Sequence, residues 1–187
     1  MTLYECITGE VSEILTQNRS MKGLTVDIPK IDIGYDLYSN AFKLFGEEFS
    51  IEKNIDFVKD FSVDNGFLNI HIKDEILLDF LSEFDVLGTE SDIDSRILAY
   101  IQLAENEKNY CDIKDFSMPL TSDVRRIILF LMKIQYLYST GTKKTDIIES
   151  EIIEILDKIR VGCESLRSFV ITYEPLLIAV RGSLAKF

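Results

Sequence analysis

The sequence contains a single histidine, His71, among its 187 residues. A catalytic zinc centre of the common type needs two or three imidazole ligands, so this class of site is excluded. Three cysteines, Cys6, Cys111 and Cys163, lie far apart without C-x-x-C spacing, which argues against a cysteine-only metal site and against a disulfide framework. We therefore expect no bound metal, no cofactor and a reducing, cytoplasmic location.

Long apolar runs and common nucleotide-binding motifs are missing as well. The best apolar run, residues 127–132, spans six residues, whereas a membrane helix needs roughly 18. The first six residues have no basic stretch leading into an apolar one, so we expect no secretory signal. Neither G-x-x-x-x-G-K-[ST] nor G-x-G-x-x-G occurs. The prediction is therefore that the protein is not an enzyme, although the residues alone leave open a Cys–His pair that uses His71.

Basic residues are scarce relative to acidic ones. The chain has 20 Lys and Arg against 32 Asp and Glu, a formal net charge of −12. Most of the excess lies in residues 1–85, with 7 basic against 17 acidic residues, whereas the sign reverses from Lys158 onward. Nucleic-acid binders are usually basic, so any affinity for RNA must come from local patches. The asymmetry indicates two units with different surfaces.

Residues 1–85 mix strand and helix patterns without regular alternation, which predicts an α+β domain with a small antiparallel sheet and helices. The spacing of apolar residues predicts helices over 4–17, 36–45, 50–61 and 75–84, and strands over 24–29 and 66–72. A small, polar junction without periodicity follows at 86–91.

Residues 92–187 are predicted to form a second domain, an all-α helical bundle. The expected helices cover 93–110, 122–139, 147–168 and 174–186. Thr121 or Ser122 can cap the second of these helices. Pro175 is expected in the first turn of the last one, where proline is tolerated.

The strand over 66–72 carries the most informative residues. Its period-two alternation places Leu68 and Ile70 toward the core, and Phe67, Asn69 and His71 on the opposite face. We expect Phe67 and Asn69 to project from this face into solvent. An aromatic ring for stacking and an amide that donates and accepts hydrogen bonds are what a reader of single-stranded bases requires. The alternative is that a helix covers this face too and that Phe67 belongs to the core.

Three segments of residues 1–85 resemble the N-terminal domain of arginyl-tRNA synthetases. Segment 26–30 (VDIPK) is similar to that family's strand and V-x-I-P element, 36–41 (DLYSNA) to its G-D-Y-x-x-N segment, and 66–74 (GFLNIHIKD) to its G-F-[IL]-N-F-x-[IL] strand. The resemblance implies a domain that grips the outer corner of tRNA, with Phe67 and Asn69 contacting a D-loop nucleotide. Asn40 and His71 join them as candidate tRNA-binding residues.

The second half resembles, more loosely, the DALR-type anticodon-binding domain of the same enzymes. Segment 99–104 (AYIQLA) is similar to Y-[IV]-Q-Y-A-H-A-R, and 174–181 (EPLLIAVR) to R-L-x-L-[VI]-x-A-[VT]-R, although 105–107 (ENE) replaces the basic end of the first motif. The resemblance makes Tyr100 and Gln102 candidate tRNA contacts, with a partly buried bundle tyrosine as the alternative for Tyr100. The basic residues Arg160, Arg167 and Arg181 are candidates for phosphate contacts, with solvated arginines on the surface of a helical bundle as the alternative.

A class I synthetase also needs an H-x-G-H signature and a K-M-S-K-like loop, and the sequence has neither. The resemblance therefore implies a non-catalytic tRNA-binding protein. We expect an adaptor that binds tRNA of the arginine type and presents it to, or regulates, a synthetase or a tRNA-modifying enzyme. No membrane or metal partner is expected. The alternative, which the acidic charge favours, is a protein-interaction module that keeps this fold and no longer binds RNA.

Overall fold

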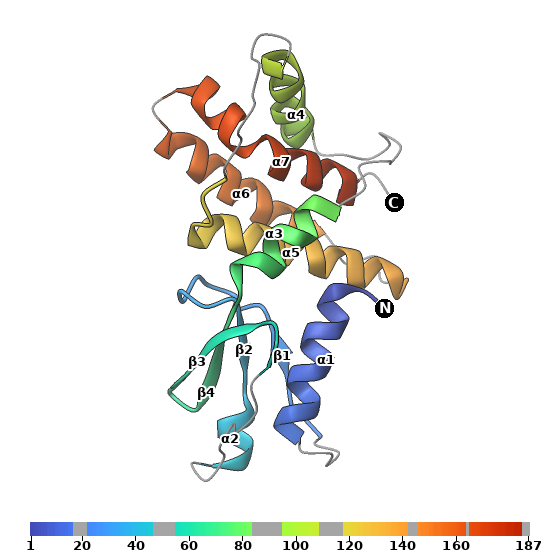
Figure 1. Ribbon diagram of the computed structural model, residues 1–187, viewed down its shortest axis with the longest axis vertical. Coiled ribbons are helices and arrows are strands. Elements are labelled where there is room, and N and C mark those ends of the chain that lie inside the picture. Colours follow the sequence, from blue (N-terminus) through green and yellow to red (C-terminus); the bar gives the residue numbers. More distant parts are fainter. Residues whose placement is uncertain are drawn as a thin grey trace. The chain divides into compact units, whose positions relative to one another are not determined.

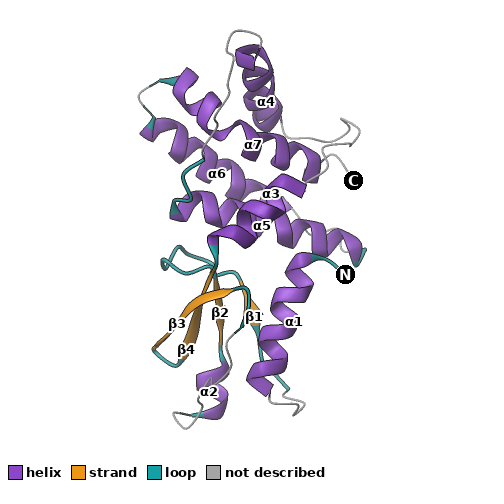
Figure 2. Ribbon diagram, viewed as in Figure 1, coloured by secondary structure: helices purple, strands orange, loops and turns teal. Residues whose placement is uncertain are grey.

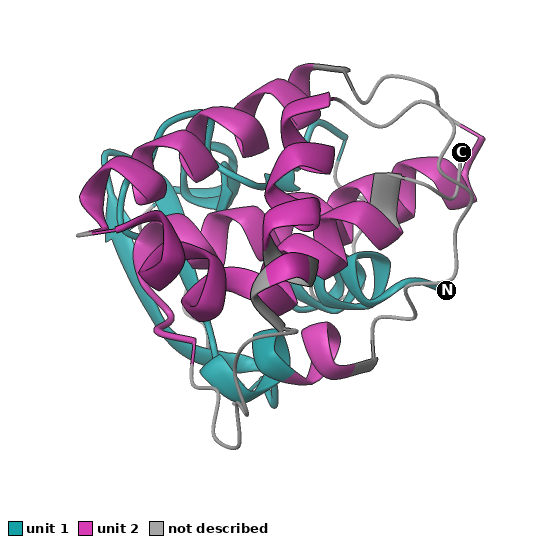
Figure 3. Cartoon of the chain, turned by 90° about the horizontal axis from the view of Figure 1, so that it is seen from above, with its two compact units in different colours: residues 1–78 teal, residues 79–187 magenta. Residues whose placement is uncertain are grey.

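A computed structural model describes residues 1–16, 22–46, 55–83, 95–108, 118–141, 146–163 and 165–184. These residues form seven helices and one four-stranded sheet (Figures 1 and 2). The chain divides into two compact units, Met1–Leu78 and Asp79–Phe187, coloured teal and magenta in Figure 3. Every strand of the described residues lies in the first unit. The predicted order, an α+β part followed by helices, is confirmed.

Unit 1 is built on a sheet with the strand order β1-β2-β4-β3, in which each pairing is antiparallel. The strands are β1 (Val26–Asp27), β2 (Leu37–Ser39), β3 (Val58–Asp64) and β4 (Phe67–Ile72). Asn65 and Gly66 close the β3–β4 hairpin with φ values of 50° and 78°, as a two-residue type I′ turn requires. The register of β3 shifts between Val58 and Asp60, which makes Lys59 an extra residue in the strand.

One face of β4 forms the core of unit 1. Leu68, Ile70 and Ile72 are at most 1 % exposed, as the alternation predicts. Helix α1 (Leu3–Thr16) buries an apolar stripe that consists of Tyr4, Ile7, Val11 and Leu15. The Tyr4 hydroxyl also donates a hydrogen bond of 2.8 Å to Oδ1 of Asp27, which joins this helix to β1.

The helix predicted over 36–45 is correct only in its second half, and the helix predicted over 50–61 is wrong in the residues that the structure describes. In the segment 36–45 only α2 (Ala41–Phe45) is helical, and Leu37–Ser39 is β2 instead. In the segment 50–61 the described residues include the start of β3, while 50–54 lie outside the described residues. Both segments pair with β4, and this pairing overrides the helical spacing of their apolar residues because strand formation depends on neighbouring strands.

The other predictions for the N-terminal part hold with shifted ends. Helix α1 and helix α3 (Asp74–Glu83) match the helices predicted over 4–17 and 75–84. The strand predicted over 24–29 is reduced to β1, which is two residues long. The junction expected at 86–91 lies outside the described residues.

The described residues after the junction form α4 (Ser95–Lys108), α5 (Ser122–Ser139), α6 (Asp146–Gly162) and α7 (Leu166–Leu184). Helix α5 has the predicted bounds, and the Thr121 hydroxyl caps it by accepting a hydrogen bond of 3.4 Å from Val124 N. The helix predicted over 174–186 has the wrong starting point. Helix α7 begins well before Pro175, which therefore lies inside the helix, where it cannot donate a hydrogen bond to the Ile171 carbonyl.

Candidate functional site

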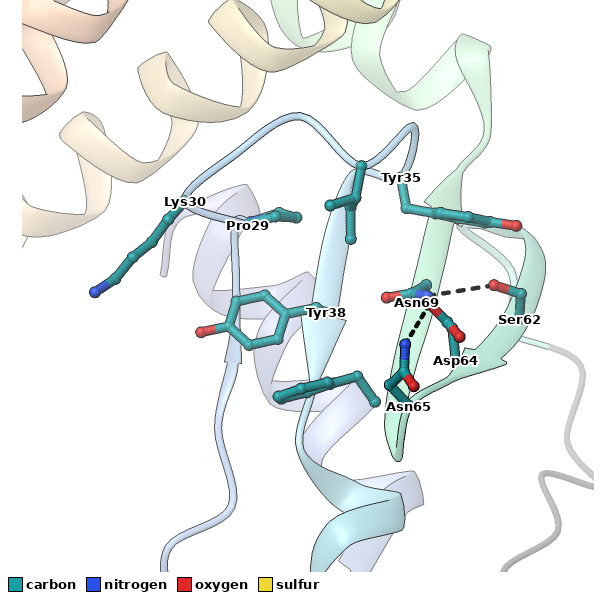
Figure 4. Close-up of a pocket in the computed structure, with 10 residues that line it drawn as sticks. Pro29, Lys30, Tyr35, Tyr38, Ser62, Asp64, Asn65 and Asn69 are labelled. Carbon is teal, nitrogen blue, oxygen red and sulfur yellow. Dashed lines mark hydrogen bonds between the residues drawn. The ribbon is translucent and has the colours of Figure 1, made fainter.

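A pocket of about 580 Å³ lies on the face of the sheet opposite the core of unit 1 (Figure 4). This volume is typical of ligand-binding clefts. The sheet and its hairpin turn supply the floor, and the loop between β1 and β2 supplies the wall. The lining residues are Tyr38, Ser62, Asp64, Asn65, Phe67 and Asn69 from the sheet and turn, and Pro29, Lys30, Ile33 and Tyr35 from the loop.

The strand register explains why these side chains meet. Tyr38 of β2 and Ser62 of β3 both pair with Asn69, one on each side of β4. Asp64 of β3 pairs with Phe67 in the next row of the same face. Residues that are directly opposite in antiparallel strands have Cβ atoms about 4.5–5.5 Å apart. The pairing therefore gathers five side chains from three strands into one patch.

Two aromatic rings form a corner in the pocket. The ring centroids of Tyr38 and Phe67 are 5.8 Å apart, and the ring planes meet at 69°. The ammonium Nζ of Lys43 lies 3.7 Å from the centroid of Phe67, and the Lys43 side chain crosses Gly66, where an added Cβ would come within 2.9 Å of Lys43 Cγ. Phe67 is therefore half-buried, which corrects the expectation that its ring projects freely into solvent.

Asn69 lies at the floor of the pocket and is only 7 % exposed, so the expectation of a solvent-exposed amide is wrong. Its Nδ2 donates a hydrogen bond of 3.5 Å to Ser62 Oγ, and its Oδ1 is turned toward Tyr38 (Figure 4). The loop that carries Pro29 and Tyr35 borders this face and contributes side chains to the lining of the pocket. Lys43 of α2 covers part of Phe67, and loop residues border Asn69, so each of the two sequence-based alternatives is only partly right.

His71 supports the pocket wall and does not line the pocket. Its Nε2 lies 3.8 Å from Asp36 Oδ2, and its Nδ1 lies 3.8 Å from Asp60 Oδ2. The ring of Tyr35 packs edge-on against the imidazole, with centroids 5.7 Å apart. Asp36 is 3 % exposed and also accepts a hydrogen bond of 2.7 Å from Ile72 N. The imidazole thus connects Tyr35 to two carboxylates on neighbouring elements.

Asn40 has a structural role outside the pocket. Its Oδ1 accepts a hydrogen bond of 2.9 Å from Thr25 N, and its Nδ2 donates one of 2.8 Å to the Gly23 carbonyl. Both ends of the amide therefore hold the segment that precedes β1. Asn40 also stands directly before α2, which agrees with its expected place at the start of a helix.

Of the two candidate residues in α4, Tyr100 is buried and Gln102 is exposed. Tyr100 is 7 % exposed, its hydroxyl donates a hydrogen bond to Asp157 Oδ1, and its ring packs edge-on against Phe169 at 5.5 Å. Burial raises the pKa of Tyr100, and the hydrogen bond to Asp157 raises it further. Gln102 is exposed on the same helix. The structure thus places Tyr100 inside the bundle, as the alternative to an RNA contact predicts.

The three candidate arginines do not form a single patch. Arg160 lies in the last turn of α6 and Arg167 in the first turn of α7, so both exposed side chains flank the α6–α7 connection. Arg160 Nε is 3.7 Å from Asp157 Oδ1. Arg181 follows Arg167 on α7 by about 21 Å at 1.5 Å per residue. Arg181 therefore lies apart from the other two arginines.

Several residues that line the pocket cannot be recognised as site residues from the sequence. Tyr35 lies in a loop without periodicity, and Tyr38 lies in a strand of three residues, which is too short for alternation to be recognised. Asp64 and Asn65 belong to a segment whose strand was not predicted. The sequence does indicate a turn at Asp64-Asn65, and Asn-Gly is the strongest short-range indication of a hairpin, but a turn alone does not mark a binding residue.

Comparison of the chain with protein-family models, with curated proteins and with solved structures finds no match. The resemblance to arginyl-tRNA synthetases therefore stays a prediction that rests on the sequence motifs. Within the described ranges, no helix has the length and apolar character needed to cross a membrane. The described part of the chain also has no cluster of three or more His, Cys, Asp or Glu side chains that could hold a metal ion.

Proposed function

We propose that the protein binds RNA without catalysing a reaction and takes an unpaired base of a folded tRNA into the sheet pocket. The observation that supports this proposal is the pocket itself, in which the rings of Tyr38 and Phe67 adjoin the amides of Asn65 and Asn69. Rings supply a stacking surface, and amides supply donors and acceptors for a base edge. In keeping with the resemblance, the tRNA would be of the arginine type, presented to a synthetase or a modifying enzyme.

Local cations can offset the acidic balance of the chain. Lys30 lies at the rim of the pocket, and Arg160 and Arg167 flank the α6–α7 connection in unit 2. Phosphate contacts fix the orientation of a nucleic acid without reading its sequence. Reversing the charge of either arginine should weaken binding to all tRNAs alike and reduce the slope of log K against log salt by about 1 per contact. Reversal at Arg181 provides the matched control.

The decisive test is Phe67→Ala, with tRNA affinity measured by fluorescence anisotropy at fixed ionic strength. Loss of one stacked base should weaken binding by roughly 5- to 150-fold, which corresponds to about 1–3 kcal/mol. The matched control is Phe61→Ala, because Phe61 is also half-buried in the same hairpin but pairs with Ile70 and so lies on the core face. The control should lower stability and leave the affinity of the folded protein intact. A Phe67→Ala protein with parental affinity would refute the proposal.

One observation favours the alternative, a protein-interaction module without affinity for RNA. The carboxylates of Asp32, Asp60 and Asp64 are exposed on the elements that surround the pocket, and each repels phosphate. Electrostatic repulsion would be strongest at low ionic strength, where screening is weakest. Failure of the parent protein to bind any tRNA at low salt, together with retention of a specific protein from a cell lysate, would select this alternative.

A further inference from the structure

The two ends of the pocket carry opposite charges. The carboxylate of Asp64 lies at one end beside Asn65, whose Nδ2 donates a hydrogen bond of 3.2 Å to Asp64 Oδ2. Lys30 lies at the other end, and Figure 4 shows its ammonium group directed away from the remaining lining residues. A ligand would therefore meet a negative charge within the pocket and a positive charge at its outer rim.

The aromatic walls can also attract a positive charge. Tyr38 and Phe67 meet at 69°, so a flat base can stack on one ring while it meets the other at an angle. The ammonium of Lys43 already rests 3.7 Å from the Phe67 centroid, although Lys43 is not among the lining residues. The π face of an aromatic ring attracts positive charge. Phe67 also lines the pocket and can attract a cationic ligand there, against the repulsion of the Lys43 ammonium.

We propose that the pocket selects a base with a fixed positive charge, namely a purine alkylated on a ring nitrogen, such as 7-methylguanine. This inference rests on the proposed function and specifies the base. The cationic ring would lie in the aromatic corner near the Asp64 carboxylate, while the phosphate of the same nucleotide would extend toward Lys30. A neutral base lacks the cation–π attraction, and the Asp64 carboxylate can attract it only by accepting hydrogen bonds and not as an opposite charge.

A methylated lysine side chain is the other cation that an aromatic corner beside a carboxylate could hold. The pocket, however, also presents the amides of Asn65 and Asn69, and a trimethylammonium group has no donor or acceptor for them. An ammonium group also has no use for Lys30 at the rim. A nucleotide uses all of these groups, and we therefore favour it.

The test compares three nucleotides by isothermal titration with the full chain in slightly acidic buffer, where alkylated guanine keeps its positive charge. The probes are the 5′-monophosphates of 7-methylguanosine, guanosine and N2-methylguanosine, the last of which adds a methyl group without a charge. We expect 7-methylguanosine monophosphate to bind about tenfold more tightly than the other two, which should bind alike.

Two variants assign the preference to the pocket. Asp64→Asn should remove most of the difference between the three nucleotides. Asp56→Asn is the matched control, because Asp56 is an exposed carboxylate just before β3 that does not line the pocket, and it should keep the full preference. A tRNA carrying natural alkylated purines should likewise bind more tightly than its unmodified transcript, and only Asp64→Asn should abolish this advantage.

Equal affinities for the three nucleotides would overturn the charge preference. The proposed function would survive that outcome if the unmodified transcript still binds in a manner that depends on Phe67. Binding of a trimethyllysine peptide but of no nucleotide would overturn the inference in favour of a protein partner. Absence of binding by every probe would also overturn it.

Discussion

The two faces of β4 differ in what covers them. Leu68, Ile70 and Ile72 lie in a core closed by packed side chains, and their burial follows from alternation alone. Phe67 and Asn69 on the other face line a pocket, to which the β1–β2 loop contributes further side chains instead of a packed layer. A residue on a polar strand face can thus be largely buried beside an open space, because neighbouring side chains surround it without filling that space.

The largest expected effect tests the packed face. Ile70→Ala should lower the free energy of unfolding by about 2–5 kcal/mol, because it removes a fully buried side chain and leaves a cavity. Its neighbour His71, on the pocket face, provides the contrast, and His71→Ala should cost about 1 kcal/mol or less. Urea denaturation of both variants measures the difference. Equal losses would show that the two faces are packed alike.

A second prediction concerns Asp36, which connects the two faces. Its buried carboxylate accepts a hydrogen bond from Ile72 N and lies 3.8 Å from His71 Nε2. Asp36→Ala would leave a buried N–H group without its acceptor, so the unfolding free energy should fall by about 1–3 kcal/mol. Asp36→Asn keeps an acceptor oxygen and should lose less. If both variants unfold at the same urea concentration, this hydrogen bond does not stabilise the sheet.

The hairpin turn provides a third test, on the pocket side. Gly66 has a φ of 78°, and an added Cβ would meet Lys43 Cγ at 2.9 Å. Gly66→Ala should therefore destabilise the protein by about 1–2 kcal/mol through backbone strain, and it should displace Lys43 from Phe67. Gly34→Ala is the control for the steric clash with Lys43, because Gly34 also has a positive φ but no atom lies within 4 Å of an added Cβ there. Thermal melts and tRNA affinity of both variants check the prediction.

The smallest effect compares two tyrosine hydroxyls. Tyr100→Phe removes a buried hydrogen bond to Asp157 and should cost about 0.5–1.5 kcal/mol, whereas Tyr38→Phe in the pocket should cost less. Measured stabilities of the two variants at neutral pH should differ accordingly. A larger loss for Tyr38→Phe would contradict the prediction.

Tyr100→Phe also tests how the stability of the protein depends on pH. Because burial and Asp157 raise the pKa of Tyr100 above the usual value of 10.0, the folded state keeps a proton that the unfolded chain loses near pH 10. The stabilisation is complete below that pH and declines as the pH rises through the folded pKa. Tyr100→Phe should flatten this decline. Burial also raises the pKa of Tyr173, which should account for part of the remaining slope.

The sequence best predicts those helices and strands that the local spacing of apolar residues defines. The strand β4 and helix α5 are long enough for alternation or helical spacing to define them, and Thr121 caps α5 as expected. Strands β2 and β3 were missed because they depend on pairing with β4, which local spacing does not encode.

The site was predicted only in part for a related reason. Phe67 and Asn69 follow from the alternation of β4, and both do line the pocket. The predicted exposure of Asn69 is wrong because only the tertiary structure brings Tyr35 and Pro29 of the β1–β2 loop to this face of the strand. Tyr100 illustrates the same limit, since a tyrosine at a helix surface position and one at an interface have the same local pattern.

The irregular register of β3 has a consequence for solubility. This strand forms an edge of the sheet, where unpaired backbone groups could template the addition of a strand from another molecule. The extra residue Lys59 interrupts the ladder near its start, and the exposed Asp60 and Asp64 place charges along it. Bulges and charges are the devices by which edge strands resist aggregation. The edge strand β3, which lines the pocket, therefore also carries features that oppose strand pairing between molecules.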